Sequence, residues 1–252
     1  GIDISKSMLA EDVAIDAKPE PAFPTSNRLN LARKFALELV GRMQGEKTGI
    51  FFFADKGVQM VPLTRDYGFI NYIIKHTGTN QLSVPGSNLV NALQTGGDML
   101  EQDKNELLSK MIIISDGEDT RNDAAKLKNS LDSLDIDHIG ISCVGTGKKE
   151  NTLIPVRNAG KIQEFYKNQG GQYLQTRLNE DNLRMIASSG SYYHLTGSNY
   201  KNIAGDIYDD IKSLGKTPRK KLSSQVKEKT TVNLAPIFIL AGLLMCTAYF
   251  VL

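Results

Sequence analysis

The sequence predicts an α/β domain with a doubly wound, mostly parallel central sheet and helices on both faces. Three observations support this class. Strand-like and helix-like segments alternate along the chain up to about residue 214. Two strand candidates, 110–115 and 137–147, are almost continuously apolar, as is typical of strands that are covered on both faces. Carboxylates follow directly after the first of them, where open α/β sheets place their binding sites.

The first residues leave room for only a very short strand before the polar sequence DISKS. A buried first strand would need several more apolar residues ahead of Asp3, so we expect the sequence to be a piece of a longer polypeptide. A proline-rich loop follows at 14–27. Apolar residues at helical spacing then predict an amphipathic helix over 27–43, with Asn27 available as its N-cap.

The elements in the middle of the chain are predicted from periodicity and from turn residues. Two strands surround the turn sequence DKG as a hairpin, and Gly96 and Gly97 weaken the second of the helices that follow. The predicted elements are strands at 48–55 and 57–64, then helices at 66–77 and 87–100.

The same reasoning applies to the remainder of the domain. Residues 146–178 are hydrophilic and contain a KNQGGQY sequence, so we predict an inserted hairpin or loop there. The predicted elements around it are the strand at 110–115, a helix at 123–135, the strand at 137–147, a helix at 180–190, a strand at 191–195 and a helix at 199–214. The domain is expected to occupy residues 1–215.

The C-terminal part has a different composition. Residues 212–229 contain seven basic residues and one acidic residue, and no charge follows them. The last 23 residues, 230–252, are uncharged and long enough for a helix that crosses a hydrocarbon core of about 30 Å. We therefore predict a basic juxtamembrane linker at 216–229 and a transmembrane helix at 230–252.

The charge distribution also excludes one class of partner. The chain has a net charge of +2, but this comes from the basic segment near the C-terminus, and the domain itself is slightly acidic. It has no basic stripe or aromatic platform, so we expect no nucleic-acid binding. Cys143 and Cys246 both lie in apolar sequence and are interpreted as buried free thiols, which leaves the redox compartment open.

A set of oxygen-bearing side chains is expected to meet at one edge of the sheet. Asp3, Ser5 and Ser7 follow the first strand, Ser87 directly precedes a helix, and Asp116 follows the apolar strand. The carboxyl ends of parallel strands meet at the same edge. Carboxylates and hydroxyls are ligands that suit Mg²⁺, which keeps several waters and needs few protein oxygens. A metal site for Mg²⁺ or Mn²⁺ is therefore predicted.

This pattern resembles the metal-ion-dependent adhesion site (MIDAS) of von Willebrand factor A (vWA) domains. The resemblance assigns Asp3, Ser5 and Ser7 to the D-x-S-x-S element, Ser87 to the hydroxyl of the second loop, and Asp116 to the aspartate of the third loop. The second loop departs from the usual pattern, because that position is typically Thr. A serine hydroxyl can coordinate in the same way, but it lacks the methyl group that stiffens the rotamer.

The resemblance extends over nearly the whole chain to the aerotolerance-type (Bat) bacterial membrane proteins. It is carried by NRLNLARKFALELV, FFFADKGVQMVPLTRD, SDGED and TRLNEDNLRMIASSGSYYHL, followed by the apolar C-terminal segment. It implies a domain that engages a partner's Asp or Glu through the metal, with other Bat proteins and a MoxR-type AAA+ ATPase as partners in stress tolerance or protein maturation. It also implies a bacterial inner-membrane location with a periplasmic domain, whereas the basic flank alone would favour a cytoplasmic one.

The alternative function is a Mg²⁺-dependent hydrolase of phosphate or ester substrates. Such an enzyme would use Ser5 or Ser7 as nucleophile, and a nucleophilic serine needs an adjacent base. No His or Lys at a suitable spacing is evident, so a binding module is expected rather than an enzyme. His76, His138 and His194 are interpreted as surface or packing residues. Glu118 and Asp119 are expected to form an acidic loop that faces water, and the alternative is that they support the metal ligands from behind.

Overall fold

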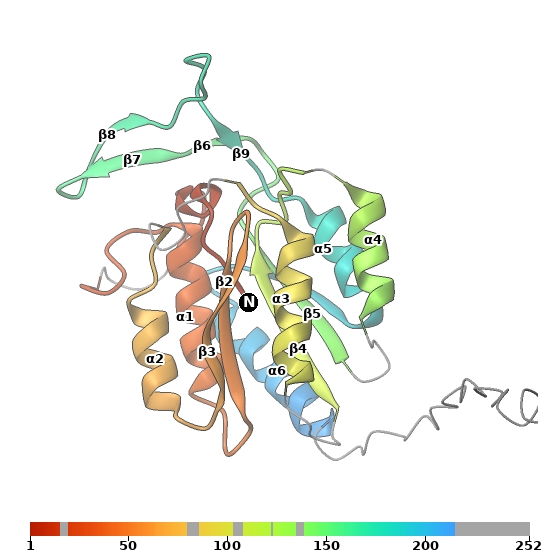
Figure 1. The fold of residues 1–252 in the computed structure, drawn as a ribbon. Coiled ribbons are helices and arrows are strands. Elements are labelled where there is room, and N and C mark those ends of the chain that lie inside the picture. Colours follow the sequence, from red (N-terminus) through yellow and green to blue (C-terminus); the bar gives the residue numbers. More distant parts are fainter. Residues whose placement is uncertain (16–19, 80–85, 103–107, 122, 135–138, 215–252) are drawn as a thin grey trace, which may run out of the picture. The chain divides into compact units, whose positions relative to one another are not determined.

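The structure is a computed structural model that describes residues 1–15, 20–79, 86–102, 108–121, 123–134 and 139–214. A six-stranded sheet with the strand order β10-β5-β4-β1-β2-β3 lies at its centre (Figure 1). Every neighbouring pair is parallel except β2 and β3, so the expected mostly parallel α/β sheet is confirmed. The strands are β1 (Ile2–Asp3), β2 (Thr48–Phe53), β3 (Gly57–Thr64), β4 (Ser109–Ser115), β5 (Ile139–Thr146) and β10 (Ser191–Leu195).

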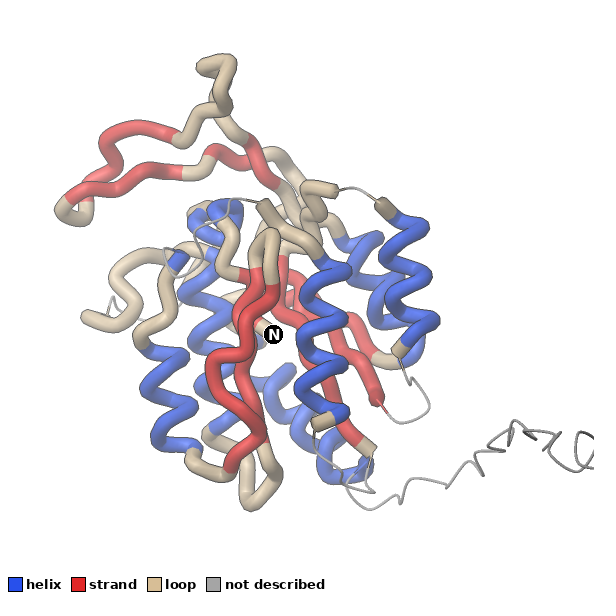
Figure 2. Tube along the Cα trace, in the orientation of Figure 1, coloured by secondary structure: helices blue, strands red, loops and turns tan. Residues whose placement is uncertain are grey.

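Helices cover both faces of this sheet (Figure 2). Side chains of α1, α2 and α6 form one apolar cluster with the sheet, and side chains of α3, α4 and α5 form another. Phe52 belongs to the first cluster and its neighbours Phe51 and Phe53 to the second, as the two-residue period of a strand requires. The helices are α1 (Arg28–Val40), α2 (Tyr67–Lys75), α3 (Leu89–Glu101), α4 (Ala124–Ser133), α5 (Glu180–Ile186) and α6 (Tyr200–Leu214), with short 3₁₀ turns η1 (Lys6–Leu9) and η3 (Ala187–Ser189).

The helices begin where the sequence places short polar side chains. Asn27 caps α1 as predicted, because its side chain accepts a hydrogen bond from the backbone N–H of Asn30. The same kind of cap starts α3 at Asn88 and α5 at Asn179. These caps fix the residues at which α1, α3 and α5 begin.

One predicted helix is shorter than expected. The segment 180–190 is α-helical only to Ile186 and then tightens into η3. The cause lies at Gly190, where a Cβ atom would overlap the backbone carbonyl of Ile141. The backbone therefore passes very close to β5 at Gly190, and β10 then pairs with β5. If α5 continued as an α-helix, the chain would move away from β5 and could not start β10 there.

The segment between β5 and α5 forms an antiparallel ribbon that stands out from the domain (Figure 1). Its strands are β6 (Thr152–Leu153), β7 (Pro155–Asn158), β8 (Lys161–Phe165) and β9 (Gln175–Thr176). β6 pairs with β9, and β7 pairs with β8 across a turn in which Ala159 and Gly160 both have positive φ. Residues 152–176 are called the ribbon below.

Cys143 lies on β5 in the second apolar cluster and is a free thiol, as expected. Burial raises the pKa of this thiol to about 12, so it is a structural residue rather than a reactive one. Cys246 and His138 fall outside the described residues, so their predicted environments stay predictions.

A cavity of about 620 Å³ opens between β2 and β4 at the end of the sheet where these strands begin. β1 lies between these two strands and pairs with β2 through Ile2 and Asp3 and with β4 through Ile2. Its walls include apolar side chains such as Leu39 and Met99. The predicted metal residues lie instead where the strands end, so this cavity is not part of the candidate site.

No helix in the part of the chain described here is long and apolar enough to span a membrane. The predicted linker at 216–229 and the predicted transmembrane helix at 230–252 lie outside the described residues.

Candidate metal site

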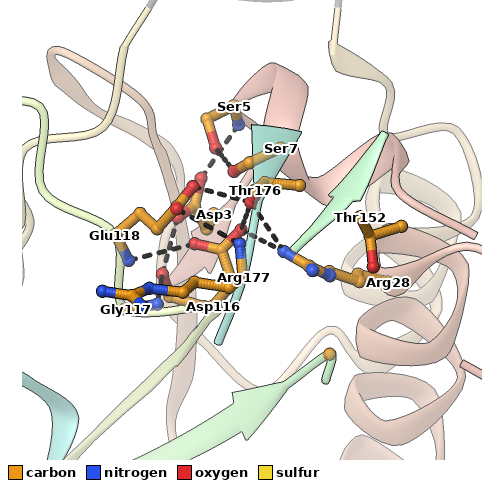
Figure 3. A network of polar contacts seen from close by, with 12 residues as sticks. Asp3, Ser5, Ser7, Arg28, Asp116, Gly117, Glu118, Thr152, Thr176 and Arg177 are labelled. Carbon is orange, nitrogen blue, oxygen red and sulfur yellow. Dashed lines mark hydrogen bonds and ion pairs between the residues drawn. The ribbon is translucent and has the colours of Figure 1, made fainter. Parts of the chain in front are cut away.

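The predicted metal residues gather where the parallel strands end, and Figure 3 shows Asp3, Ser5, Ser7 and Asp116 among them. Asp3 ends β1, and Asp116 follows β4, which is paired with β1. Ser87 arrives from the segment before α3, and its hydroxyl donates a hydrogen bond of 3.1 Å to Asp3 Oδ2. The structure therefore joins loops that are 84 residues apart in the sequence.

The D-x-S-x-S segment turns back on itself directly after β1. The backbone N–H of Ser5 donates to Asp3 Oδ1 over 2.9 Å, and Ser5 Oγ lies 2.9 Å from Ser7 Oγ. The chain then enters η1, which holds Ser7 on the same side as Ser5 (Figure 3). This local turn explains the spacing of the three oxygen-bearing residues, because it brings alternate side chains together.

Asp3 is completely shielded from water and accepts a third hydrogen bond, of 2.6 Å, from the hydroxyl of Ser115. Its burial, followed by the neighbouring negative charge of Asp116, raises the pKa of Asp3 to about 7. Hydrogen bonds from Ser115 and Ser5 oppose this shift. The site thus holds two close carboxyl groups that repel each other when both are ionised.

Asp116 pairs with a cationic side chain, that of Arg28 at the start of α1. Arg28 Nη1 donates to Asp116 Oδ2 over 2.8 Å, and both side chains are fully buried. The same guanidinium forms two hydrogen bonds with Asp12, of 2.9 and 2.6 Å. Burial alone would raise the pKa of Asp12, but these bonds and the charge of Arg28 hold it below its usual value. One buried cation therefore serves two carboxylates.

The turn after Asp116 depends on a glycine. Gly117 has a φ of 74°, and a Cβ atom there would overlap the backbone carbonyl of Asn179. The backbone N–H of Asn179 donates to the Asp116 carbonyl over 2.7 Å, and the Asn182 side chain donates to the Gly117 carbonyl over 2.9 Å. The start of α5 thus fixes the backbone that carries the third-loop aspartate.

The ribbon also reaches the site. The hydroxyl of Thr176, on β9, accepts a hydrogen bond from Arg28 Nη1 and lies 2.6 Å from Glu118 Oε2 and 3.4 Å from Asp116 Oδ2 (Figure 3). The backbone N–H of Arg177 donates to Glu118 Oε1 over 3.2 Å. Burial, and then the charge of Asp116, raises the pKa of Glu118. Glu118 is therefore half-buried and hydrogen-bonded, and the expectation that it faces water was wrong.

Sequence reasoning missed Arg28, Thr176 and Ser115. Arg28 had a usable signal, because it lies four residues before Ala32 and seven before Phe35, on the apolar face of the helix. A cation on such a face indicates a buried ion pair. Thr176 had no comparable signal, since its place depends on the path of the ribbon.

The donor set fits a hard divalent cation. It consists of the buried carboxylates of Asp3 and Asp116 with the hydroxyls of Ser5, Ser7 and Ser87. All five are oxygen donors, as Mg²⁺ and Mn²⁺ prefer, and a cation would offset the repulsion between the two carboxylates. Among the described residues, no group of three or more His, Cys, Asp or Glu side chains is arranged to hold a metal.

The two described histidines are engaged elsewhere. His194 Nε2 lies 3.0 Å from the carbonyl oxygen of Gly147, and the His76 ring stacks near Tyr72 with ring centroids 4.2 Å apart. These packing contacts agree with the expected role of both residues.

Comparison with known proteins identifies a domain family. A family model described as von Willebrand factor type A domain matches residues 2–118. No curated protein matches the chain. The crystal structure of the conserved hypothetical protein BatB from Bacteroides thetaiotaomicron is 26% identical, with a TM-score of 0.70 over 86% of this chain and 97% of that chain.

Two further structures are similar. An aerotolerance-related membrane protein from Bacteroides fragilis is 25% identical, with a TM-score of 0.70 over 84% of this chain and 96% of that chain. Proximal thread matrix protein 1 from the mussel byssus, in a structure with a zinc-occupied MIDAS motif, is 15% identical with a TM-score of 0.56 over 86% of this chain and 46% of that chain. The mussel protein shares the fold alone. The chain therefore contains a von Willebrand factor type A domain, and it is similar to proteins of the Bat type.

Proposed function

We propose that this protein is a membrane-anchored binding module that holds Mg²⁺ or Mn²⁺ and uses it to engage an acidic residue of a partner protein. The metal would be held by Asp3, Ser5, Ser7, Ser87 and Asp116. The observation that carries the proposal is the hydrogen bond between Ser87 and Asp3, because it joins two separate loops of the predicted set beside the buried Asp116. The zinc-occupied MIDAS motif of the mussel protein supports metal binding by this fold.

The chemistry of the donors favours a binding role. Mg²⁺ prefers about six oxygen ligands, and few protein oxygens leave coordination positions for water or for a ligand. A carboxylate from a partner would suit such a position, because a hard cation prefers an anionic oxygen. The metal would add positive charge beside Asp3 and Asp116, of which Asp116 already pairs with Arg28.

The cellular setting is proposed from the family. Similarity to BatB and to an aerotolerance-related membrane protein supports a place in a Bat-type envelope complex, with a MoxR-type ATPase as a further partner. The uncharged segment 230–252 would anchor the chain in the bacterial inner membrane, and the domain would face the periplasm.

Nothing in the described residues favours the hydrolase alternative. Ser5 and Ser7 hydrogen-bond to each other and are not described in a hydrogen bond with a basic side chain. A serine nucleophile would need such a base.

Calorimetric titration of the full chain in detergent with Mg²⁺ and Mn²⁺ tests the proposal. Wild type is expected to bind one ion, and Asp3→Asn is expected to lose binding while it keeps a cooperative thermal transition. Asn preserves the shape of the side chain, and metal-free protein no longer has to bury a second carboxylate. Asp98→Asn, on the exposed side of α3, is the matched control. Equal metal affinity in Asp3→Asn and wild type would refute the site.

A further inference from the structure

Within the part of the chain that the structure describes, the ribbon forms no strand pair with the central sheet. Its strands pair only with each other among the described residues, as β6 with β9 and β7 with β8. All of β8 except Phe165 is exposed. A two-stranded ribbon is at best marginally stable in water without further packing. Its outer edges therefore present backbone groups that another extended chain can pair with.

The ribbon and its short flanks are positively charged, in contrast to the rest of the domain. Residues 146–178 contain six basic and two acidic residues. Two of the basic side chains form ion pairs with the domain, Arg157 with Glu11 and Lys149 with Glu180. The side chains of Lys161 and Lys167 on the ribbon and of Arg177 directly after it are exposed, and they give this part of the chain an excess of positive charge.

Apolar side chains are exposed beside these charges. Tyr173 is 54% exposed and Ile162 is 45% exposed. The Tyr173 ring contacts Phe165 edge-on, with centroids 6.2 Å apart, and Lys167 lies 5.2 Å from the Tyr173 centroid. Aromatic rings next to cations are well suited to contact with another chain, since they offer area and charge together.

The ribbon is joined to the candidate metal site from two sides. Thr176 bonds to Arg28 and Glu118 beside Asp116, as described above. On the other side Lys6, between the two serines of the D-x-S-x-S element, lies 4.9 Å from the ring centroid of Tyr166. A ligand on the metal would therefore lie next to the ribbon.

We propose that the ribbon is the second part of the partner-binding surface and that it takes an extended, acidic segment of a partner protein. One carboxylate of that segment sits on the metal. The following residues run along the ribbon, where Lys161, Lys167 and Arg177 attract further carboxylates and Tyr173 covers apolar side chains. This inference rests on the proposed function, because it names the kind of partner that the same site would bind.

Two features favour a peptide over other polyanions. The open strand edges offer hydrogen bonds that suit an extended backbone, as in β-strand addition. The rest of the domain is net acidic, which would repel a long nucleic acid or a flat anionic membrane but not a short segment confined to the ribbon.

The test uses the full chain in detergent and a fluorescein-labelled peptide of about ten residues that alternates Glu and Val. Fluorescence anisotropy is measured with Mg²⁺ and with EDTA, and a peptide with Gln in place of Glu is the ligand control. Lys161→Glu combined with Lys167→Glu is compared with Lys126→Glu combined with Lys128→Glu on α4, an equal charge change on exposed residues. Tyr173→Ser is compared with Tyr72→Ser, because Tyr72 on α2 is also well exposed, at 58%.

Wild type is expected to bind the acidic peptide in Mg²⁺ and to lose most of that binding in EDTA. The ribbon double variant should weaken peptide binding about tenfold with unchanged Mg²⁺ affinity, and Tyr173→Ser should weaken it several-fold, while the controls stay within about twofold. Equal effects of ribbon and control variants, or no saturable peptide binding by wild type, would overturn the inference.

The two proposals can fail separately. Mg²⁺ binding with no ribbon effect leaves the metal site intact and removes the ribbon surface. Peptide binding that depends on the ribbon but not on any bound metal retains the surface and removes the metal-dependent function. A third outcome is that wild type binds vesicles with anionic lipid but not the peptide, and that the ribbon double variant abolishes vesicle binding. This would show that the ribbon contacts a membrane instead.

Discussion

Arg28 Nη1 donates a hydrogen bond of 2.8 Å to Asp116 Oδ2, and neither side chain is exposed to water. The guanidinium also holds Asp12 by two further bonds, so it stands between the third-loop aspartate and the segment that follows η1. A buried cation that serves two carboxylates cannot be removed without leaving charge unpaired in a low-dielectric environment.

Arg28→Met is therefore expected to lower the free energy of unfolding by about 3–5 kcal/mol, since methionine fills part of the space but pairs with neither carboxylate. Urea denaturation in EDTA measures this loss. Mg²⁺ should recover part of it, because a bound cation would replace some of the missing positive charge. Arg42→Met, which removes a partly exposed pair with Glu38, is the control and should cost at most about 1 kcal/mol. Equal losses of unfolding free energy in the two variants would show that the buried Arg28 pairs stabilise the fold no more than a partly exposed pair does.

A second prediction concerns pH. The pKa of Asp12 is held below its usual value, so its ion pair stabilises the folded state above the unfolded pKa of about 4. This contribution is lost as the pH falls through the lower pKa of the folded state. Asp12→Asn should therefore cost about 2 kcal/mol at pH 7, and the difference from wild type should shrink below about pH 4. Denaturation of both proteins from pH 7 to pH 3 measures it. A difference that stays constant over this range would contradict the assigned pairing.

Gly117→Ala should damage both stability and the candidate site. The residue needs a positive φ, and the new Cβ atom would overlap the Asn179 carbonyl, so the turn after Asp116 must shift. We expect a loss of more than about 2 kcal/mol together with weaker Mg²⁺ binding. Gly160→Ala is an informative control, because Gly160 has a φ of 80° but no atom within 4 Å of an added Cβ. It should lose only about 1 kcal/mol and keep its metal affinity.

The proposed C-terminal anchor gives a prediction outside the described residues. The full chain should stay in the membrane pellet after a carbonate wash, and a chain that ends at residue 215 should not. The basis is the uncharged segment 230–252. Release of the full chain into the wash would contradict the anchor.

The orientation of the domain can be tested with an introduced thiol. Ser26 is exposed in the proline-rich loop, so Ser26→Cys in a Cys246→Ser background should react with an impermeant thiol reagent on intact spheroplasts if the domain is periplasmic. Cys143 should not interfere, because it is buried and its pKa is raised to about 12. Labelling that requires lysis would place the domain in the cytoplasm.

Sequence patterns predicted the regular part of the fold well because that part depends on local geometry. The apolar run in β4 and the Asn27 cap of α1 follow from residue type and spacing alone. The convergence of Asp3 with Ser87 was also expected, because Asp3 follows a strand at the binding edge of the sheet and Ser87 directly precedes a helix that was placed at the same edge. The boundary of α5 did not, because it is set by the close approach of Gly190 to Ile141 on a different strand.

The parts of the site that were missed depend on contacts between distant segments. Thr176 meets Asp116 only because the ribbon returns to the domain at that point, and no periodicity encodes the return path. Arg28 could have been found, because its charge lies on an apolar helix face. Glu118 is half-buried because Thr176 bonds to it. The position of Thr176 was not predicted, so the environment of Glu118 was predicted wrongly as well.

The central position of β1 has a kinetic consequence. Ile2 pairs with Phe52 on one side and with Ile114 on the other. To form both pairs, the chain must close two loops of very different length, one from β1 to β2 and one from β1 to β4. Parallel pairings at such separations form slowly, because loop entropy is lost before the contacts compensate for it. We expect β1 to dock late in folding. A divalent cation that binds Asp3 and Asp116 would then slow unfolding far more than it speeds folding, and stopped-flow measurements in Mg²⁺ and EDTA would separate the two rates.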